Sequence, residues 1–490
     1  MKVHTTFRMG LIAGVILMMS SGAAVAQKAA SPKARVNANA KVSPMDAQIA
    51  AALKEISAAR IQATIEKLVS FGTRLTISGG SVESGRGVVA AREWIKSEFE
   101  RYSKDCSGCL EVKTDSFVEQ PMRRIPKPTE IVNVYAVLRG TDKQASKRIV
   151  LVTGHYDSRP SDDQDVQSDA PGANDDGSGT AVSLECARVL SKRKFPATII
   201  FLTVAGEEQG LNGSRHFAQM AKQQGWNIEA ALNNDIVGGD RSPGQRTDVV
   251  RVFSEGIPQP DLKDAVAVAL IRAVGAESDS PSRELARYIA ATAPVYLRER
   301  GVGVNKKHVK MGVSVGEPRL APMLVFRPDR YLRGGDHTAF NQFGFAAVRF
   351  TEYRENYNHQ HQNVRTANGI EYGDLPKFVN FDYAANVARL NAAVLASLAS
   401  APAPPENVRL ETEKLENDST LMWDASPDGK VSGYEILWRA TTAPDWEYAV
   451  PAGNVTQFTV QQSKDNVIFA VRAVDAQGHR GLAAFPMPKR

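Results

Sequence analysis

A chain of 490 residues is too long for one ordinary hydrophobic core, so we expect at least two domains. With 43% apolar and 23% charged residues, the composition is that of a globular protein and excludes a wholly disordered one. The formal net charge of +6 is a weak bias, and basic residues gather only in the short stretch Lys28–Lys41, which argues against nucleic-acid binding.

The first 26 residues have the three-part pattern of a secretory signal peptide. Lys2 and Arg8 precede the apolar run Leu11–Met19, and Ala-Val-Ala follows. This run is shorter than the roughly 20 residues that a membrane-spanning helix needs. We therefore expect cleavage of residues 1–26, a flexible linker over 27–43, and export to the periplasm or the extracellular space, with no membrane span elsewhere.

The chain has three cysteines. Cys106 and Cys109 lie in a loop-like stretch, where an oxidising compartment favours a local disulfide over a redox centre. Cys186 lies on a predicted helix, where we expect a small buried apolar side chain.

Helical and strand-like segments alternate from about residue 44 to residue 400. Two strand-like runs are continuously apolar, as expected of central strands covered on both faces. The pattern predicts a three-layer α/β/α domain with a mixed central sheet over residues 44–400. The expected strands are Val112–Val118, Ile131–Leu138, Ile149–Thr153, Thr198–Val204, Leu232–Ile236, Val249–Phe253 and Ala346–Phe350. The expected helices are Asp46–Val69, Gly87–Tyr102, Gly179–Lys192, Gly213–Gln223 and Leu375–Leu398.

Residues 257–333 form a long interval between predicted strands. Leu262–Val274 and Arg283–Leu297 have helical periodicity, and a charged, Gly-rich stretch follows. This interval is either a lid or wall of the substrate cleft, or an added structural layer.

A Pro-rich hinge at 401–406 precedes a region of different texture. Residues 407–490 have short strands and regular turns, which predict a small all-β sandwich. Its Trp423, Tyr434 and the strand Val471–Asp475 resemble a fibronectin type III domain. That resemblance implies contact with a surface or polymer as one role for this region.

Polar residues follow the apolar strands of the first domain. His155 comes just after one strand, Glu207 and Glu208 follow the next, and Asp235 follows a third. Asp175 lies in a turn-rich loop that opens a helix. Open α/β sheets bind ligands at the carboxyl ends of their strands, and acids gathered there need a counter-charge. Mixed imidazole and carboxylate donors favour zinc over calcium or magnesium.

These motifs resemble the co-catalytic di-zinc aminopeptidases of peptidase clan MH, which include relatives of bacterial leucyl aminopeptidases and of glutamate carboxypeptidase II. The resemblance covers about 240 residues, from Val150 to Tyr383. It implies two zinc ions per chain bridged by Asp175. His155 and Asp235 would bind one ion, and Glu208 with a later histidine would bind the other.

Two histidines compete for that last position. The family commonly has His-x-x-x-Asp, and His359 with Asn363 has this spacing, whereas His361 would place Arg365 at the acidic position. We therefore expect His359, with Asn363 as a neutral partner of the imidazole. Tyr357 is a candidate helper at the oxyanion.

The remaining roles follow from the resemblance and from the chemistry of such sites. Glu207 matches the general base that takes a proton from water, which would leave a metal-bridging hydroxide, and its neighbours should raise its pKa. Asp157 is placed to accept a hydrogen bond from the imidazole of His155. Asp336 and His337 should support the site through hydrogen bonds. Solvated loop carboxylates are expected at Asp162, Asp163, Asp165 and Asp176.

The sequence thus predicts an exported zinc-dependent exopeptidase that hydrolyses N-terminal peptide bonds. The alternatives on the same fold are a carboxypeptidase, a glutaminyl cyclase and a receptor without activity. A carboxypeptidase would need a basic pocket, for which Arg327, Arg330 and Arg333 are candidates. A Ser-His-Asp hydrolase is disfavoured, because no Gly-x-Ser-x-Gly turn follows a strand.

Overall fold

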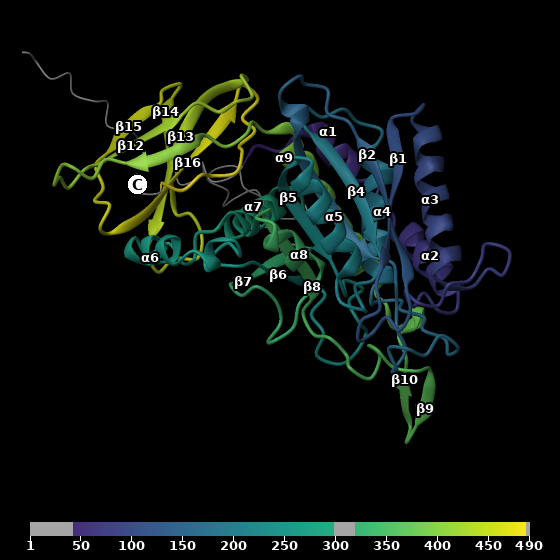
Figure 1. The fold of residues 1–490 in the computed structure, drawn as a ribbon. Coiled ribbons are helices and arrows are strands. Elements are labelled where there is room, and N and C mark those ends of the chain that lie inside the picture. The colour runs from purple at the N-terminus through teal and green to yellow at the C-terminus, as the bar shows by residue number, and fades with distance from the viewer. Residues whose placement is uncertain (1–42, 298–318, 487–490) are drawn as a thin grey trace, which may run out of the picture. The chain divides into compact units, whose positions relative to one another are not determined.

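The computed structural model describes residues 43–297 and 319–486 (Figure 1). The predicted signal peptide and nearly all of the predicted linker lie outside these residues, as does part of the 257–333 interval. No helix among the described residues is long and apolar enough to cross a membrane.

An eight-stranded mixed sheet forms the centre of the first domain (Figure 1). Its order is β1-β2-β4-β3-β5-β8-β6-β7, and β4, β3, β5 and β8 run parallel to one another. β1 pairs with β2, β2 with β4, and β6 with β8 in antiparallel register. The bounds are β1 Leu110–Glu119, β2 Thr129–Leu138, β3 Arg148–His155, β4 Thr198–Val204, β5 Asn227–Asn234, β6 Val249–Phe253, β7 Ala321–Val325 and β8 Ala347–Glu352.

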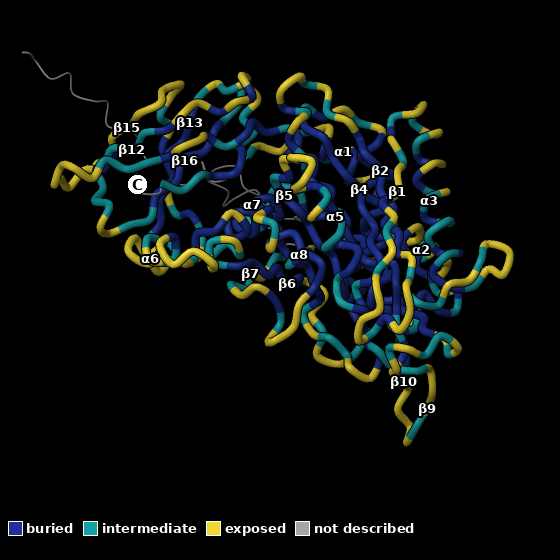
Figure 2. The backbone as a smooth tube through the Cα atoms, in the orientation of Figure 1, coloured by how far each residue is buried: buried dark blue, intermediate teal, exposed yellow. Residues whose placement is uncertain are grey.

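Alternate residues of the central strands point into two separate cores. Val150 and Val152 of β3 join the core that contains the helices α1, α2, α3, α4, α7 and α9, whereas Leu151 joins the core beneath α5 and α8. Figure 2 shows that the central strands β4 and β5 are largely buried, whereas the edge strand β1 is partly exposed. This period-2 burial on both faces confirms the three-layer α/β/α prediction.

The helices of this domain follow the predicted pattern with one break. The expected helix over Asp46–Val69 is two helices, because the chain turns at residues 54–57 and Ser57 caps the second helix by accepting from the backbone N–H of Arg60. The bounds are α1 Ala47–Leu53, α2 Ala58–Val69, α3 Gly87–Asp105, α4 Gly177–Leu190, α5 Asn212–Gln223, α6 Ala265–Ala273, α7 Pro281–Tyr296, α8 Asp336–Gln342 and α9 Phe381–Ser400.

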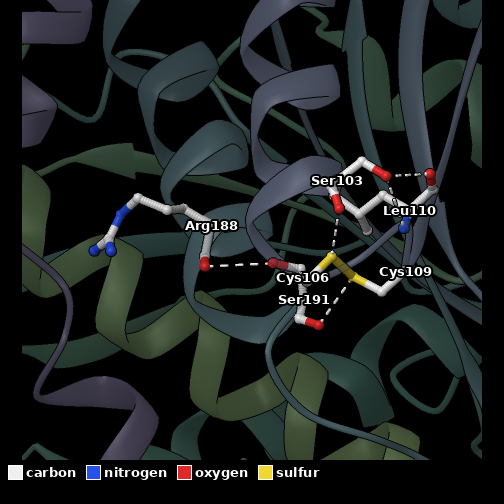
Figure 3. Close-up of a disulfide and its surroundings, with 6 residues drawn as sticks. All are labelled: Ser103, Cys106, Cys109, Leu110, Arg188 and Ser191. Carbon is white, nitrogen blue, oxygen red and sulfur yellow. Dashed lines mark hydrogen bonds between the residues drawn. A yellow bond between two sulfur atoms is a disulfide. The ribbon is translucent and has the colours of Figure 1, made fainter.

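A disulfide closes the turn between α3 and β1 (Figure 3). As predicted, it joins Cys106 to Cys109. Their Cα atoms are 5.5 Å apart. Cys109 Sγ also lies 3.1 Å from the carbonyl of Ser191, at the end of α4. Cys186 is buried and free, which agrees with a packing role.

The described part of the 257–333 interval is mainly structural. α7 packs against α9 and against β7, and β7 extends the sheet by pairing with β6 in parallel register. β7 was not predicted, because it has only five residues and follows a charged stretch without strand periodicity. α7 therefore belongs to a packed helical layer of the domain, and residues 298–318 lie outside the described residues.

The C-terminal region consists of two three-stranded antiparallel sheets, β11-β12-β15 and β14-β13-β16, as expected of a small sandwich. Trp423 and Ile436 lie in its core. β14 was not predicted. The resemblance to a fibronectin type III domain stays a prediction. The bounds are β11 Glu406–Leu410, β12 Ser419–Asp424, β13 Val431–Ala440, β14 Tyr448–Gly453, β15 Gln457–Val460 and β16 Val467–Asp475, and a separate hairpin is formed by β9 Arg365–Ala367 and β10 Ile370–Tyr372.

Buried polar contacts join this sandwich to α7 and the residues before it. Arg439 donates to Asp279 across 2.6 Å, and the indole N–H of Trp446 donates to Glu284 across 2.9 Å. The predicted hinge is also packed, since Arg148 donates to the carbonyl of Ala401. The sandwich is therefore a docked part of the described structure.

Candidate metal centre

The carboxyl ends of three neighbouring parallel strands meet at one edge of the sheet. β3 ends at His155, Glu207 and Glu208 lie in the turn after β4, and Asp235 follows β5. Asp175 lies in the loop that leads into α4. The residues predicted at the strand ends are thus brought together with Asp175. The predicted histidine ligand His359 is discussed below.

Their donor atoms form two clusters, which we call the His155 cluster and the His361 cluster. The first contains His155, Glu207 and Asp235, and in it the donor atoms lie within 4.8 Å of one another. The second contains Asp175, Glu208 and His361 under the same limit.

Asp175 links the two clusters. Its Oδ1 lies 3.2 Å from Nε2 of His155, and its Oδ2 lies 2.9 Å from Nε2 of His361. His361 Nε2 is also 3.0 Å from Oε1 of Glu208. Each carboxylate oxygen of Asp175 therefore faces a different cluster, which is the arrangement that a bridging ligand needs. The peptide bond between Asp175 and Asp176 is cis.

Three of the donor atoms are buried and face only other donor atoms of the two clusters. Nε2 of His155, Oε1 of Glu208 and Nε2 of His361 make no hydrogen bond to a group outside the clusters among the described residues. Unsatisfied buried polar atoms are rare, and three that converge on one place fit coordination of a cation. Imidazole and carboxylate donors in groups of three suit zinc.

The structure places His361 in this centre and not His359. Nδ1 of His359 lies 2.5 Å from Asp240 Oδ2, and its ring stacks on Phe378 with centroids 3.7 Å apart. The choice of His359 from the His-x-x-x-Asp spacing does not agree with this placement. His361 has a φ of +56°, an irregular backbone position that no motif spacing in the sequence indicates.

The partner expected for His359 differs as well. Asn363 does not contact that imidazole among the described residues. It accepts from the backbone N–H of Ser161 and donates to Ser168, so it fastens the histidine-bearing loop to the loop after β3. Asp240 takes the place that was predicted for Asn363.

Asp157 lies beside His155 as expected, but its main contacts are different. Nδ1 of His155 is 3.1 Å from the backbone carbonyl of Asp157 and 3.5 Å from its Oδ1. The other carboxylate oxygen accepts from the hydroxyl of Thr76 and from the backbone N–H of Glu208. Asp157 therefore orients both a histidine and the turn that carries the two glutamates.

Glu207 lies in an environment that favours proton uptake. Burial raises the pKa of Glu207 well above its usual value, and the charges of Asp235 and Glu208 add to this, although His155 opposes them. A carboxylate with a raised pKa can hold a proton that it has taken from water. This agrees with a base role and separates Glu207 from its neighbour Glu208.

Arg349 is a site residue that the sequence did not reveal. Its fully buried guanidinium donates from Nη2 to Oδ1 of Asp235 across 2.7 Å. Nη1 of the same side chain lies 3.5 Å from Asp329. Arg349 comes from β8, next to β5 in the sheet, and only the strand order reveals this neighbour.

Two further residues hold the Asp175 loop and were also missed. Arg74 is fully buried and donates to the carbonyls of Tyr156 and Gly172 across 2.7 and 2.8 Å. Asp374 accepts from the backbone N–H groups of Asn174 and Asp175. Both contacts use backbone atoms from distant parts of the chain, which leave no local signal in the sequence.

Asp176 is not the solvated carboxylate that we expected. It is fully buried, caps α4 through the backbone N–H of Gly179, and accepts from the backbone N–H of His155. This position joins β3 to the start of α4 and so fixes His155 relative to Asp175.

Asp336 and His337 lie on α8, and among the described residues neither makes the expected hydrogen bond to a residue of the two clusters. Both residues are fully buried, and burial raises the pKa of Asp336 to about 7. Nε2 of His337 lies 2.7 Å from the carbonyl of Pro328. Tyr357 is 63% exposed, so the structure gives no support for a role at the oxyanion.

Comparison with known proteins agrees with this centre. The model of peptidase family M28 matches residues 133–270. A protein of Pyrenophora teres f. teres described as a probable zinc metalloprotease is 44% identical over 464 residues, which cover 94% of this chain and 91% of that protein. Another from Leptosphaeria maculans is also 44% identical, over 445 residues that cover 90% of this chain and 97% of the relative.

The LapA aminopeptidase of Legionella pneumophila is 20% identical and superposes with a TM-score of 0.47, over 74% of this chain and 77% of that one.

The fold, the buried donor clusters and the curated relatives together define a zinc-dependent metallopeptidase. The chain belongs to peptidase family M28.

Proposed function

We propose that this metallopeptidase is an aminopeptidase that uses two zinc ions. The observation that carries the proposal is the position of Asp175 between the clusters, 3.2 Å from His155 and 2.9 Å from His361. His155 and Asp235 would hold one ion, Glu208 and His361 the other, and Asp175 both.

The zinc pair supplies a lowered pKa for bound water and polarisation of the scissile carbonyl. Glu207 takes the proton of the attacking water and delivers it to the leaving amine. Asp157 keeps the His155 imidazole in position, and Arg349 restrains Asp235 through the 2.7 Å ion pair.

One feature disfavours a carboxyl terminus as the group that is recognised. Two of the three arginines considered for a carboxylate pocket, Arg330 and Arg333, both bond Glu355.

Export is part of the proposal. The signal-like sequence of residues 1–26 supports it, and the Cys106–Cys109 disulfide suits an oxidising compartment.

A substrate panel tests the activity. Purified zinc-loaded protein should release the first residue from unblocked peptides and leave N-acetylated copies intact. Removal of residues from the carboxyl end of the acetylated peptides would instead indicate a carboxypeptidase. Cyclisation of an N-terminal glutamine without cleavage would indicate a glutaminyl cyclase. Absence of N-terminal cleavage, C-terminal cleavage and cyclisation would favour a receptor.

A further inference from the structure

We infer that Arg159 binds a carboxylate of the substrate, carried by the residue that follows the scissile bond. This inference rests on the proposed aminopeptidase function and assigns a specificity-determining residue to it. The carboxylate is either the α-carboxylate of a dipeptide or the side chain of an aspartate or glutamate.

Arg159 lies next to the centre without a close partner. Its side chain is 15% exposed, and Nε is 4.0 Å from Oε2 of Glu208 and 3.4 Å from the carbonyl of Pro160. Its two Nη groups make no hydrogen bond or ion pair with any residue in the described ranges 43–297 and 319–486. Asp162, Asp163 and Asp165 on the same loop do not pair with it either.

Neighbouring arginines are all engaged. Arg124, on the other side of Glu208, donates to the carbonyl of that residue across 2.8 Å and pairs with Asp163 across 2.9 Å. Arg349 pairs with Asp235 across 2.7 Å. Arg159 therefore differs from these arginines in having donors that no group in the described part of the chain uses.

A metal in the centre leaves Arg159 without a counter-charge. Glu208 would give its charge to zinc, so its 4.0 Å contact no longer balances the guanidinium. A largely buried cation that lacks a partner is unfavourable. A guanidinium with free Nη groups is the protein side chain best suited to bind a carboxylate through two parallel hydrogen bonds, in bidentate geometry.

Charge also decides the side of the scissile bond. The α-ammonium group of the substrate would be repelled by Arg159 and would not bind against its guanidinium. The anion recognised by Arg159 therefore belongs on the leaving side. The enzyme should prefer dipeptides, or peptides with an acidic second residue.

Four substrates and three variants test the inference. Ala-Ala and Ala-Ala-amide compare the α-carboxylate with its neutral form, and Ala-Glu-amide and Ala-Gln-amide compare the acidic side chain with its isostere. The wild type should cleave at least one charged member about 10- to 100-fold more efficiently in kcat/KM, as expected of one charge-assisted hydrogen-bonding pair. Arg159→Met should abolish that preference, and Arg159→Lys should restore part of it.

The matched control is Arg365→Met. Arg365 is exposed, donates to Gln362, and lies over the ring of Tyr372. This variant removes the same charge and should keep the preference. The zinc content and melting temperature of each variant show whether the fold and the centre are intact.

A binding measurement separates the inference from the proposed function. In a Glu207→Gln background, calorimetry should show tighter binding of the charged peptide, and adding Arg159→Met should remove the difference. Equal hydrolysis of charged and neutral substrates by the wild type would refute the inference while leaving the aminopeptidase intact. If no substrate is cleaved, equal binding of both members of each pair refutes it, and a difference that depends on Arg159 supports it.

Discussion

Nε2 of His361 lies 2.9 Å from Oδ2 of Asp175, whereas the nearby His359 faces Asp240. The contact between His361 and Asp175 joins two loops that are far apart in the sequence. It completes the His361 cluster.

The first prediction separates these two histidines. His361→Ala should lower the zinc content from about two ions per chain to about one, because a donor of the His361 cluster is lost. His359→Ala should keep both ions, because its imidazole is engaged with Asp240. Elemental analysis after dialysis measures the content. Loss of zinc from the His359 variant alone would restore the assignment made from sequence.

The second prediction concerns Glu207. Glu207→Gln should lower kcat by about 10²- to 10⁴-fold, the usual contribution of a general base, and leave zinc content unchanged. Steady-state kinetics with an unblocked peptide measures the loss. Glu66→Gln is a control on an exposed part of α2 and should have wild-type kinetics. Wild-type turnover in the Glu207 variant would mean that another group takes the proton.

The third prediction is a pH dependence of zinc binding. Burial lowers the pKa of His361, but the charges of Glu208 and Asp175 outweigh it and raise that pKa to about 10 in the metal-free site. Zinc needs the neutral imidazole, so binding at pH 7 must release this proton. Apparent affinity should therefore rise by about tenfold per pH unit for each proton released, and level off near pH 10.

Calorimetry in buffers of different ionisation enthalpy counts the released protons. His361→Ala should release fewer protons than the wild type. Zinc affinity that is constant between pH 6 and pH 9 would contradict the prediction.

The fourth prediction concerns the docked sandwich. Asp279 is buried and pairs with Arg439 across 2.6 Å and with Arg287 across 3.1 Å. Asp279→Ala should lower the free energy of unfolding by about 3–5 kcal/mol, because two buried guanidinium groups lose a counter-charge. Urea unfolding measures the change. Asp248→Ala, which removes an exposed pair with Arg246, should have little effect.

The same contacts bear on the proposal that the sandwich binds a surface or polymer. Ending the chain at residue 400 would remove at least one buried partner from each of Asp279, Glu284 and Arg148. We expect such a truncation to lower the melting temperature, so a test of surface binding needs point variants on exposed strands of the sandwich.

Local patterns in the sequence determined the central sheet and most of the metal centre. The middle residues of β3 and β4, 149–152 and 199–202, are continuously apolar, and the polar residues after them mark where buried strands end. The carboxyl ends of neighbouring parallel strands lie at the same edge of a sheet, whatever the conformation of the loops. His155, Glu208 and Asp235 could therefore be placed from sequence. β7 and β14 were missed because short edge strands carry weak periodicity.

Only the tertiary structure decided which groups complete and support that centre. His361 enters it through a left-handed turn, Arg349 reaches Asp235 from a neighbouring strand, and Arg74 holds the Asp175 loop through backbone carbonyls. These contacts join residues far apart in the chain and depend on irregular backbone, so no period of 2 or 3.6 residues encodes them. The sequence determined where the metal donors gather, and long-range packing decided which donors face one another.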